Sequence, residues 1–383
     1  MRRAGTALLA ATACLAALSG APAWAGSPGP AESPAAATTA TTAAVVPQCT
    51  GTAPIVCHAD VPPGTYDVTA VLGGAQAGST GVTAESRRTM LAATPTAAGQ
   101  RLIRSFTVNV REPEGEPTGP SGSPGLDLAF GGDAPRLAGL KVTEVTKASE
   151  VSEATKVTEV SEATKTTPGR RHQLFLGGDS TVCDQLTAPY TGWGQQLPQF
   201  FRRGLSVANY ADSGESSGSF LADPRLFATM RPLIRPGDTV LVQFAHNDKQ
   251  TTAADYRANL GALLDGVPAR GGKPVLVTPI VRRWFNDDGT LDNATALHIN
   301  GLGVNLPAEM RSLAAERGVP LIDLTALTKR LVEELGPEGS KRLYLYDEAR
   351  DNTHTSAHGA TEFARLVLGE LRAQRLVPAG VLR

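Results

Sequence analysis

Two segments far apart in the sequence hold the residue types of a serine nucleophile and its base. Ser180 lies in the segment GGDST, where a serine that opens toward a helix N-terminus could be an exposed nucleophile. Asp351 precedes His354 by three residues, so a tight turn can bring its carboxylate to Nδ1 of the imidazole. That contact would fix the tautomer and leave Nε2 to accept the proton of Ser180. The three residues predict nucleophilic attack on an acyl group, although a tight turn alone also explains GGDST.

Two further segments could supply hydrogen-bond donors to the oxyanion that such an attack creates. Gly214 lies in NYADSGESS, where a glycine lets the backbone approach a substrate closely. Asn247 lies in FAHND, and its side-chain amide could be a donor beside the backbone N–H groups of Ser180 and Gly214. A Gly/Ser-rich loop and a turn-forming asparagine are the alternative interpretations. His246 and Asp248 are expected to orient their loop rather than to react.

The elements that must position these residues begin at residue 172, where strand-like and helix-like patterns alternate. Apolar periodicity predicts two helices, one with Tyr256, Leu260 and Leu264 on a single face and one with Phe363 and Val367. Such alternation predicts a three-layer α/β fold with a parallel five-stranded sheet, whose carboxyl ends gather functional groups. The predicted strands are short apolar runs closed by polar residues or glycine, at 173–176, 205–209, 239–244, 274–277 and 321–324.

A second domain is expected ahead of the α/β domain. Short alternating runs between turn signals, at 66–71, 105–110 and 126–130, predict an all-β sandwich. A repetitive segment rich in Val, Thr, Glu and Lys follows it; a helix is conceivable there, but an extended linker is favoured. Without anchors in that linker, the two domains are expected to fold independently. The expected order is a signal peptide at 1–25, a flexible lead-in at 26–47, the β domain at 48–145, the linker at 146–171 and the catalytic domain at 172–383.

The first 25 residues have the three parts of a secretory signal. Arg2 and Arg3 precede an apolar run from Ala7 to Leu18, and a small-x-small site ends at Ala25. The run is too short to be a membrane anchor, and too little apolar sequence precedes Cys14 for lipid attachment there. We therefore expect a secreted, extracellular protein with no membrane association after the signal is removed.

Charge and cysteine content limit the partners and the folding chemistry. The chain has 36 Lys and Arg against 37 Asp and Glu, and loss of the signal leaves it mildly acidic, so nucleic acid is not an expected partner. In an oxidising compartment, Cys49 and Cys57 are close enough in sequence to form a disulfide, although free thiols remain the alternative. Cys183 would then be unpaired. We expect a monomer.

The four segments together resemble the blocks of the SGNH (GDSL-type) hydrolases. GDS, N-x-A-x-x-G-x-S, HND and D-x-T-H followed by Gly-Ala occur in that order, and the last two are similar to those of rhamnogalacturonan acetylesterases. The resemblance covers about residues 172–383 and implies that Ser180 is the nucleophile, His354 the base and Asp351 its partner. It also implies an oxyanion hole formed by the N–H groups of Ser180 and Gly214 and the amide of Asn247. Bacterial members often carry a jelly-roll, galactose-binding-like domain in front, which the β domain resembles in outline.

The expected function is removal of small acyl groups, above all acetyl, from a plant cell-wall polysaccharide of the rhamnogalacturonan or pectin type, or from a related acetylated glycan. Arg282 and Arg283 match a TP-x-x-RR pattern of the family and could pair an anionic sugar, or they could be a solvated surface pair. Trp193 and Trp284 could stack on sugar faces, or could be half-buried packing residues. A short-chain lipid or aryl-ester esterase is one alternative, and a non-catalytic carbohydrate-binding protein is another.

Two departures from the pectin-directed relatives bear on the substrate. Ala245 stands where those relatives usually have glycine, which would strain the chain only if that position needs a positive φ. Glu215 stands where they often have arginine, and its carboxylate would repel a nearby galacturonate.

No cofactor is expected. His354 and His358 stand four residues apart, but the glutamate of a zinc-binding helix is missing, so no metal site is expected either.

Overall fold

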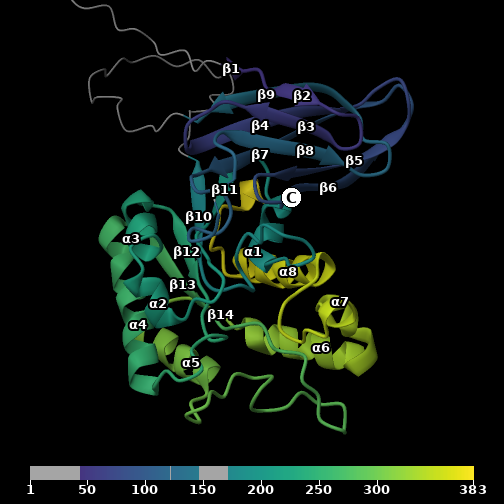
Figure 1. Ribbon diagram of the computed structural model, residues 1–383. Helices are drawn as coiled ribbons and strands as arrows, with labels where there is room; N and C mark the ends of the chain where they lie inside the picture. The colour runs from purple at the N-terminus through teal and green to yellow at the C-terminus, as the bar shows by residue number, and fades with distance from the viewer. Residues whose placement is uncertain (1–43, 121, 146–170) are drawn as a thin grey trace, which may run out of the picture. The chain divides into compact units, whose positions relative to one another are not determined.

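The computed structural model describes residues 44–120, 122–145 and 171–383 (Figure 1). The expected signal peptide at 1–25, most of the lead-in and nearly all of the linker lie outside the described residues. Within the described ranges, no helix has the length and apolar character needed to cross a membrane.

The described residues up to 145 form two antiparallel sheets with a shared core. Side chains alternate along the strands, so Tyr66, Val68 and Ala70 of one strand point to a core that also holds Leu128 and Phe130 of the other sheet. This is the expected β sandwich. The first sheet has the order β1 (Ala44–Val45), β9 (Leu137–Glu144), β4 (Gly64–Gly73) and β7 (Arg101–Val110). The second has β2 (Gln48–Thr50), β3 (Ile55–Ala59), β8 (Leu126–Gly131), β5 (Gly78–Ala84) and β6 (Arg88–Thr96).

A disulfide joins the first two strands of the second sheet. Cys49 of β2 and Cys57 of β3 face each other in the antiparallel register, with their Cα atoms 4.0 Å apart. Cys183 is a free, buried cysteine in the α/β domain.

The residues from 172 onward form the expected α/β domain around one parallel sheet. Neighbouring strands are parallel throughout, and their apolar side chains are buried on both faces, which explains their continuous apolar runs. The order is β11 (Leu205–Asn209), β10 (His172–Gly177), β12 (Thr239–Val242), β13 (Lys273–Val277) and β14 (Leu321–Ile322).

Helices cover both faces of this sheet (Figure 1). One face packs against α2 (Ser217–Ala222), α3 (Phe227–Met230), α4 (Ala253–Gly266) and α5 (Leu306–Arg317). The other packs against α1 (Trp193–Gln196), α6 (Leu324–Gly339) and α8 (Ala357–Ala373), and α7 (Tyr346–Ala349) precedes α8 in the chain. Single-turn 3₁₀ helices lie at 197–200, 231–233, 268–270, 341–343 and 379–381.

The fifth strand ends two residues earlier than its apolar run suggests. Asp323 interrupts the run, and its side chain accepts a hydrogen bond from the N–H of Ala326 as the N-cap of α6. Leu324, which was expected to end the strand, is therefore the first residue of a helix, because capping of the helix N-terminus favours an aspartate at this point.

Candidate active site

Three loops bring polar side chains to one edge of the parallel sheet. Ser180 follows β10, Gly214 follows β11 and Asn247 follows β12, and these three strands are neighbours in the sheet. Because parallel strands end at the same edge, the loops meet there. Asp351 and His354 come to the same place from the loop between α7 and α8.

Ser180, His354 and Asp351 form a continuous chain of hydrogen bonds. The Oγ of Ser180 lies 3.0 Å from Nε2 of His354, and Nδ1 of His354 lies 2.7 Å from Oδ2 of Asp351. The other oxygen of Asp351 accepts the backbone N–H groups of Thr353 at 2.7 Å and His354 at 2.9 Å, which is the turn that the sequence predicts. Burial raises the pKa of Asp351, but hydrogen bonds from His354 and Thr353 outweigh it and lower the pKa to about 2.

The loop that carries Asp351 and His354 is held on both sides. The carbonyl of His354 accepts the N–H of Leu345 at 3.0 Å. The guanidinium of Arg283 donates to Oδ1 of Asn352 at 2.8 Å and also to the carbonyl of Pro337. The ring of Tyr190 meets the imidazole of His354 edge to face, with centroids 5.4 Å apart. These contacts fix the direction of the imidazole toward Ser180.

The residues expected to bind an oxyanion line the same edge. Gly214 has a φ of +84°, a left-handed conformation that favours glycine, and it is exposed. The amide of Asn247 donates to the carbonyl of Glu215 at 3.1 Å, which uses one of its two protons and joins the two loops. Asp248 joins them again, because its carboxylate accepts the hydroxyl of Ser217 at 2.6 Å.

Asp179 and His246 form a buried pair behind Ser180, and Asp179 had no role assigned from its sequence motif. The carboxylate of Asp179 accepts the N–H and hydroxyl of Thr181 at 2.9 and 2.7 Å and lies 3.1 Å from Nδ1 of His246. Burial raises the pKa of Asp179, but His246 and Thr181 outweigh it and lower that pKa, whereas burial lowers the pKa of His246. The pair is therefore an ionised carboxylate with a neutral imidazole. An aspartate two residues before a threonine, in the pattern D-S-T, is the signal that could have indicated this turn.

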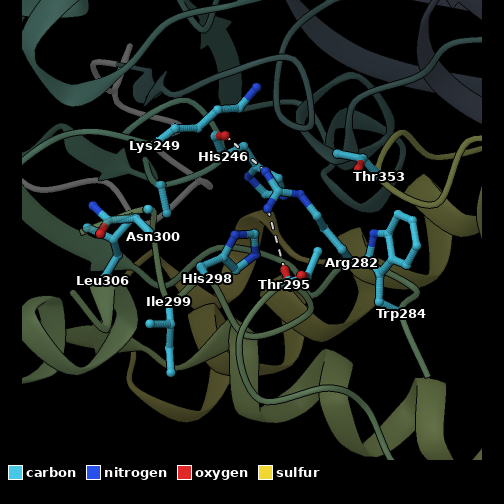
Figure 2. Close-up of a pocket in the computed structure, with 12 residues that line it drawn as sticks. His246, Lys249, Arg282, Trp284, Thr295, His298, Ile299, Asn300, Leu306 and Thr353 are labelled. Carbon is cyan, nitrogen blue, oxygen red and sulfur yellow. Dashed lines mark hydrogen bonds between the residues drawn. The ribbon is translucent and has the colours of Figure 1, made fainter. Parts of the chain in front are cut away.

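A pocket of about 360 Å³ reaches Thr353, the residue before His354 (Figure 2). Lys249, Arg282 and the exposed Trp284 are its chemically distinctive side chains. Figure 2 shows the guanidinium of Arg282 beside His246, where it donates to the carbonyls of His246 at 2.9 Å and Thr295 at 3.4 Å. Sequence reasoning missed Lys249, although it directly follows the HND motif. The remaining lining residues are Ala245, His246, Thr295, His298, Ile299, Asn300, Gly301 and Leu306.

Three residues expected to contact substrate do not lie in this pocket. Trp193 is buried, and its indole N–H donates to Oε1 of Gln243 at 3.0 Å, so it is a core residue and cannot stack on a sugar. Arg283 is only 7% exposed, because it holds the loop around Asn352. Glu215 is half-buried, and its carboxylate is hydrogen-bonded to Ser219 of α2.

Ala245 causes no strain in the loop that follows β12. Its φ is not positive, so the position does not require glycine. Among the described residues, no group of three or more His, Cys, Asp or Glu side chains is arranged to hold a metal ion.

Comparison with known proteins agrees with this geometry. The sequence pattern of the GDSL-like lipase/acylhydrolase family matches residues 176–361, which include every residue of the hydrogen-bonded chain. Rhamnogalacturonan acetylesterase RhgT of Bacillus subtilis is 38% identical to this protein over 211 residues, covering 51% of this chain and 87% of RhgT. The chain belongs to the GDSL-like lipase/acylhydrolase family. As a member of this family, it is a hydrolase of carboxylic esters.

Two other relatives of this GDSL-family protein come from the same organism. The probable rhamnogalacturonan acetylesterase YesY of Bacillus subtilis is 31% identical over 208 residues, which are 51% of this chain and 90% of YesY. The crystal structure of YxiM from Bacillus subtilis matches with a TM-score of 0.50 and 25% identity, covering 85% of this chain and 81% of that one. The matched 85% of this chain is more than residues 172–383 alone could supply, so the structural similarity extends into the β domain.

Proposed function

We propose that this protein is an exported serine esterase that removes acetyl groups from a plant cell-wall polysaccharide of the rhamnogalacturonan type. The observation that carries the proposal is the chain of hydrogen bonds from Ser180 through His354 to Asp351, at 3.0 and 2.7 Å. The similarity to RhgT, a rhamnogalacturonan acetylesterase, and to YesY, a probable one, supports the choice of an acetylated pectic substrate.

In the proposed mechanism, the oxygen of Ser180 attacks the ester carbonyl while Nε2 of His354 takes its proton. Asp351 stays ionised because its pKa is about 2, so it stabilises the imidazolium that forms. The N–H groups of Ser180 and Gly214 and the amide of Asn247 stabilise the oxyanion. His354 then gives its proton to the sugar oxygen that leaves. Water activated by the same imidazole attacks the acetyl-enzyme, which releases acetate and restores the hydroxyl of Ser180.

The pocket beside the triad is the proposed site for the sugar that carries the acetyl group. Lys249 and Arg282 give it positive charge, which suits the carboxylate of a galacturonate, and Trp284 offers an exposed aromatic face. Arg282 is held by hydrogen bonds to two backbone carbonyls, whereas no hydrogen bond or ion pair among the described residues holds the ammonium of Lys249, which can therefore follow the substrate.

Export is proposed from the signal-like residues 1–25. The disulfide between Cys49 and Cys57 is consistent with an oxidising compartment.

The test of the proposal is acetate release from acetylated rhamnogalacturonan by the full chain and its variants. Ser180→Ala and His354→Ala are each expected to remove at least 99.9% of the activity, on the polymer and on p-nitrophenyl acetate, roughly the ~10³-fold or greater loss typical of triad residues. Ser312→Ala on the exposed face of α5 is the matched control and should act like the wild type. Aryl-ester hydrolysis that survives Ser180→Ala would contradict the serine mechanism.

Two alternatives give different results in the same assay. An esterase for short-chain lipid or aryl esters would hydrolyse p-nitrophenyl acetate but release no acetate from the polymer. A non-catalytic carbohydrate-binding protein would bind the polymer without acetate release and without any effect of Ser180→Ala.

A further inference from the structure

Two segments of the β domain contact the loops that carry the active site. Residues 86–88, which lead into β6 and include its first residue, and residues 111–118, between β7 and β8, make hydrogen bonds and ion pairs with residues of the α/β domain. The second segment is called the bracing segment below. Its contacts fall on residues 179–184, called the nucleophile turn below, and on the loop of Gly214.

A buried ion pair connects the β domain to the nucleophile turn. Nε of Arg88 lies 3.0 Å from Oδ2 of Asp184, without hydrogen-bond geometry, and the two side chains are 1% and 0% exposed. Arg111, the first residue of the bracing segment, lies 3.8 Å from the same oxygen. The other oxygen of Asp184 accepts the amide of Asn209, the last residue of β11, at 2.8 Å. One carboxylate therefore links the β domain, the nucleophile turn and the strand that leads to Gly214.

Thr118 of the bracing segment holds the loop of Gly214 through Asp212. Its backbone N–H donates to Oδ2 of Asp212 at 2.6 Å, and its hydroxyl donates to Oδ1 at 2.9 Å. The backbone N–H of Asp212 donates to the carbonyl of Gly178 at 3.0 Å. Asp212 is thus fixed on one side to the turn of Ser180 and on the other to the β domain.

Glu116 of the bracing segment joins the same two loops. Its Oε1 accepts the hydroxyl of Ser213, the residue before Gly214, and lies 2.8 Å from Sγ of Cys183. On the other side of Ser213, the amide of Gln185 donates to its hydroxyl at 3.3 Å and to the carbonyl of Ser180 at 3.0 Å.

The contacts of Thr118 and Glu116 matter because few atoms constrain Gly214 directly. It is exposed, it has a positive φ, and a Cβ built on it would meet no atom within 4 Å. Its N–H belongs to the peptide group that links Ser213 to Gly214, so its direction depends on Asp212 and Ser213, which the β domain holds. Asn247 and Asp248 hold the residues that follow Gly214. An oxyanion donor works only when it points to the position where charge develops, and small displacements are costly.

We propose that Thr118 and Glu116 are positioning residues of the esterase, through which the β domain sets the geometry of the oxyanion hole. They touch no substrate and act through Asp212, Ser213 and the backbone of Gly214. This inference rests on the proposed function, because it assigns these residues to the oxyanion hole of that reaction.

The test compares Thr118→Val and Glu116→Ala in the full chain with p-nitrophenyl acetate as substrate. Each is expected to lower kcat about tenfold while KM changes less than about twofold, because the lost alignment affects charge that forms in the transition state. Phenylboronic acid forms a tetrahedral adduct that imitates that state, so its inhibition constant should rise by about the same factor. Thr118→Ser and Glu116→Gln keep a hydroxyl and an accepting oxygen, and should recover most of the lost kcat.

Matched controls separate positioning from general stability. Thr50→Val and Glu144→Ala are the same types of change at exposed positions of the β domain, and they should leave kcat and the melting temperature unchanged. The melting temperature of each variant shows whether it is folded. If Thr118→Val or Glu116→Ala has a lowered melting temperature, the kcat of Thr118→Ser or Glu116→Gln decides the result.

Three results would overturn the inference. Folded Thr118→Val and Glu116→Ala with the kcat of the wild type would show that the bracing segment does not act on the reaction. An increase in KM with unchanged kcat would show that it binds substrate instead. A wild-type chain without Ser180-dependent aryl-ester activity would overturn the proposed function first, and the inference with it, so the two failures are distinguishable.

Discussion

His354, which contacts Ser180, and His246, which contacts the neighbouring Asp179, differ in exposure, and this difference separates their roles. The side chain of His246 is 2% exposed, and it donates from Nδ1 to the ionised Asp179, while burial lowers its pKa. It stays neutral and fixed, as a structural support for the turn of Ser180. The side chain of His354 is 30% exposed and lies between Asp351 and Ser180, so it can carry a proton between the nucleophile and the solvent-facing substrate.

At the residue scale, Asn247→Ala is expected to lower kcat by ~10² to 10³ with little change in KM. The amide acts on charge that develops in the transition state, so its loss affects the chemical step more than binding. Steady-state kinetics on p-nitrophenyl acetate measure both constants. A rise in KM with constant kcat would mean that Asn247 binds the ground-state substrate.

Lys249→Gln tests the charge of the pocket. Lys249 is exposed and lines the pocket, so its removal should raise KM severalfold for acetylated rhamnogalacturonan and leave KM for neutral acetylated xylan nearly constant. The difference should shrink as salt screens the charge. Lys273→Gln, at the amino end of β13 on the opposite edge of the sheet, is the control. Equal effects on both polymers would show that the pocket does not bind an anionic sugar.

At the element scale, the start of α8 decides where His354 lies. Ser356 caps the helix, and its side chain accepts the N–H of Gly359 at 3.1 Å. A Cβ on Gly359 would lie 1.8 Å from the carbonyl oxygen of Leu343, so only glycine allows this close approach. The first turn of α8 therefore packs directly on the backbone that precedes the catalytic loop. This close packing explains why the Gly-Ala pair after the D-x-T-H motif begins with glycine.

Gly359→Ala is expected to destabilise the protein by about 3 kcal/mol, and to lower kcat because the loop of His354 must move with the helix. Gly369→Ala in the same helix is the matched control. Its Cβ would meet no atom within 4 Å, so it should be neutral or stabilise by up to about 1 kcal/mol. Thermal unfolding and aryl-ester kinetics measure both effects. Equal stability of the two variants would contradict the close approach at Leu343.

At the scale of the whole molecule, the β domain and the α/β domain share buried polar contacts. Arg88 and Asp184 are almost fully buried against each other, and the amide of Gln195 donates to the carbonyl of Ser86 across the same interface. Separating the domains would return both charges to water, so this ion pair alone adds little to the stability of the interface. Separation would also break the hydrogen bonds of Thr118 with Asp212 and of Arg87 with the carbonyl of Gln185. The interface is therefore expected to hold without the covalent linker.

Cleavage within residues 147–168 tests this expectation. The linker composition alone predicts two independently folded pieces, whereas the interface predicts that the two pieces stay together and keep aryl-ester activity. A protease site placed in this segment and size-exclusion chromatography after cleavage measure the outcome. Elution of two separate species would show that the interface is too weak to hold the domains. Activity of a separated α/β piece would further show that the β domain is dispensable for the reaction.

The sequence by itself determined the local features of this protein. Apolar runs and periodicity placed β10 to β13 and helices α4 and α8, because burial on a sheet or a helix face imposes a repeat that can be read along the chain. The four motifs could also be recognised in the sequence, because their residues are close together or follow strand ends. They are the motifs with Ser180, Gly214 and Asn247 and the Asp351–His354 turn.

Only the tertiary structure decided which side chains face the site. Trp193 and Arg283 have residue types suited to sugar binding, but their partners Gln243 and Asn352 come from distant segments, and these contacts bury them. The bracing contacts to Asp212 and Ser213 likewise come from residues more than 90 positions earlier in the chain. Long-range contacts of this kind leave no periodic signal, because the two partners are brought together by the packing of whole domains and not by the spacing of residues along the chain.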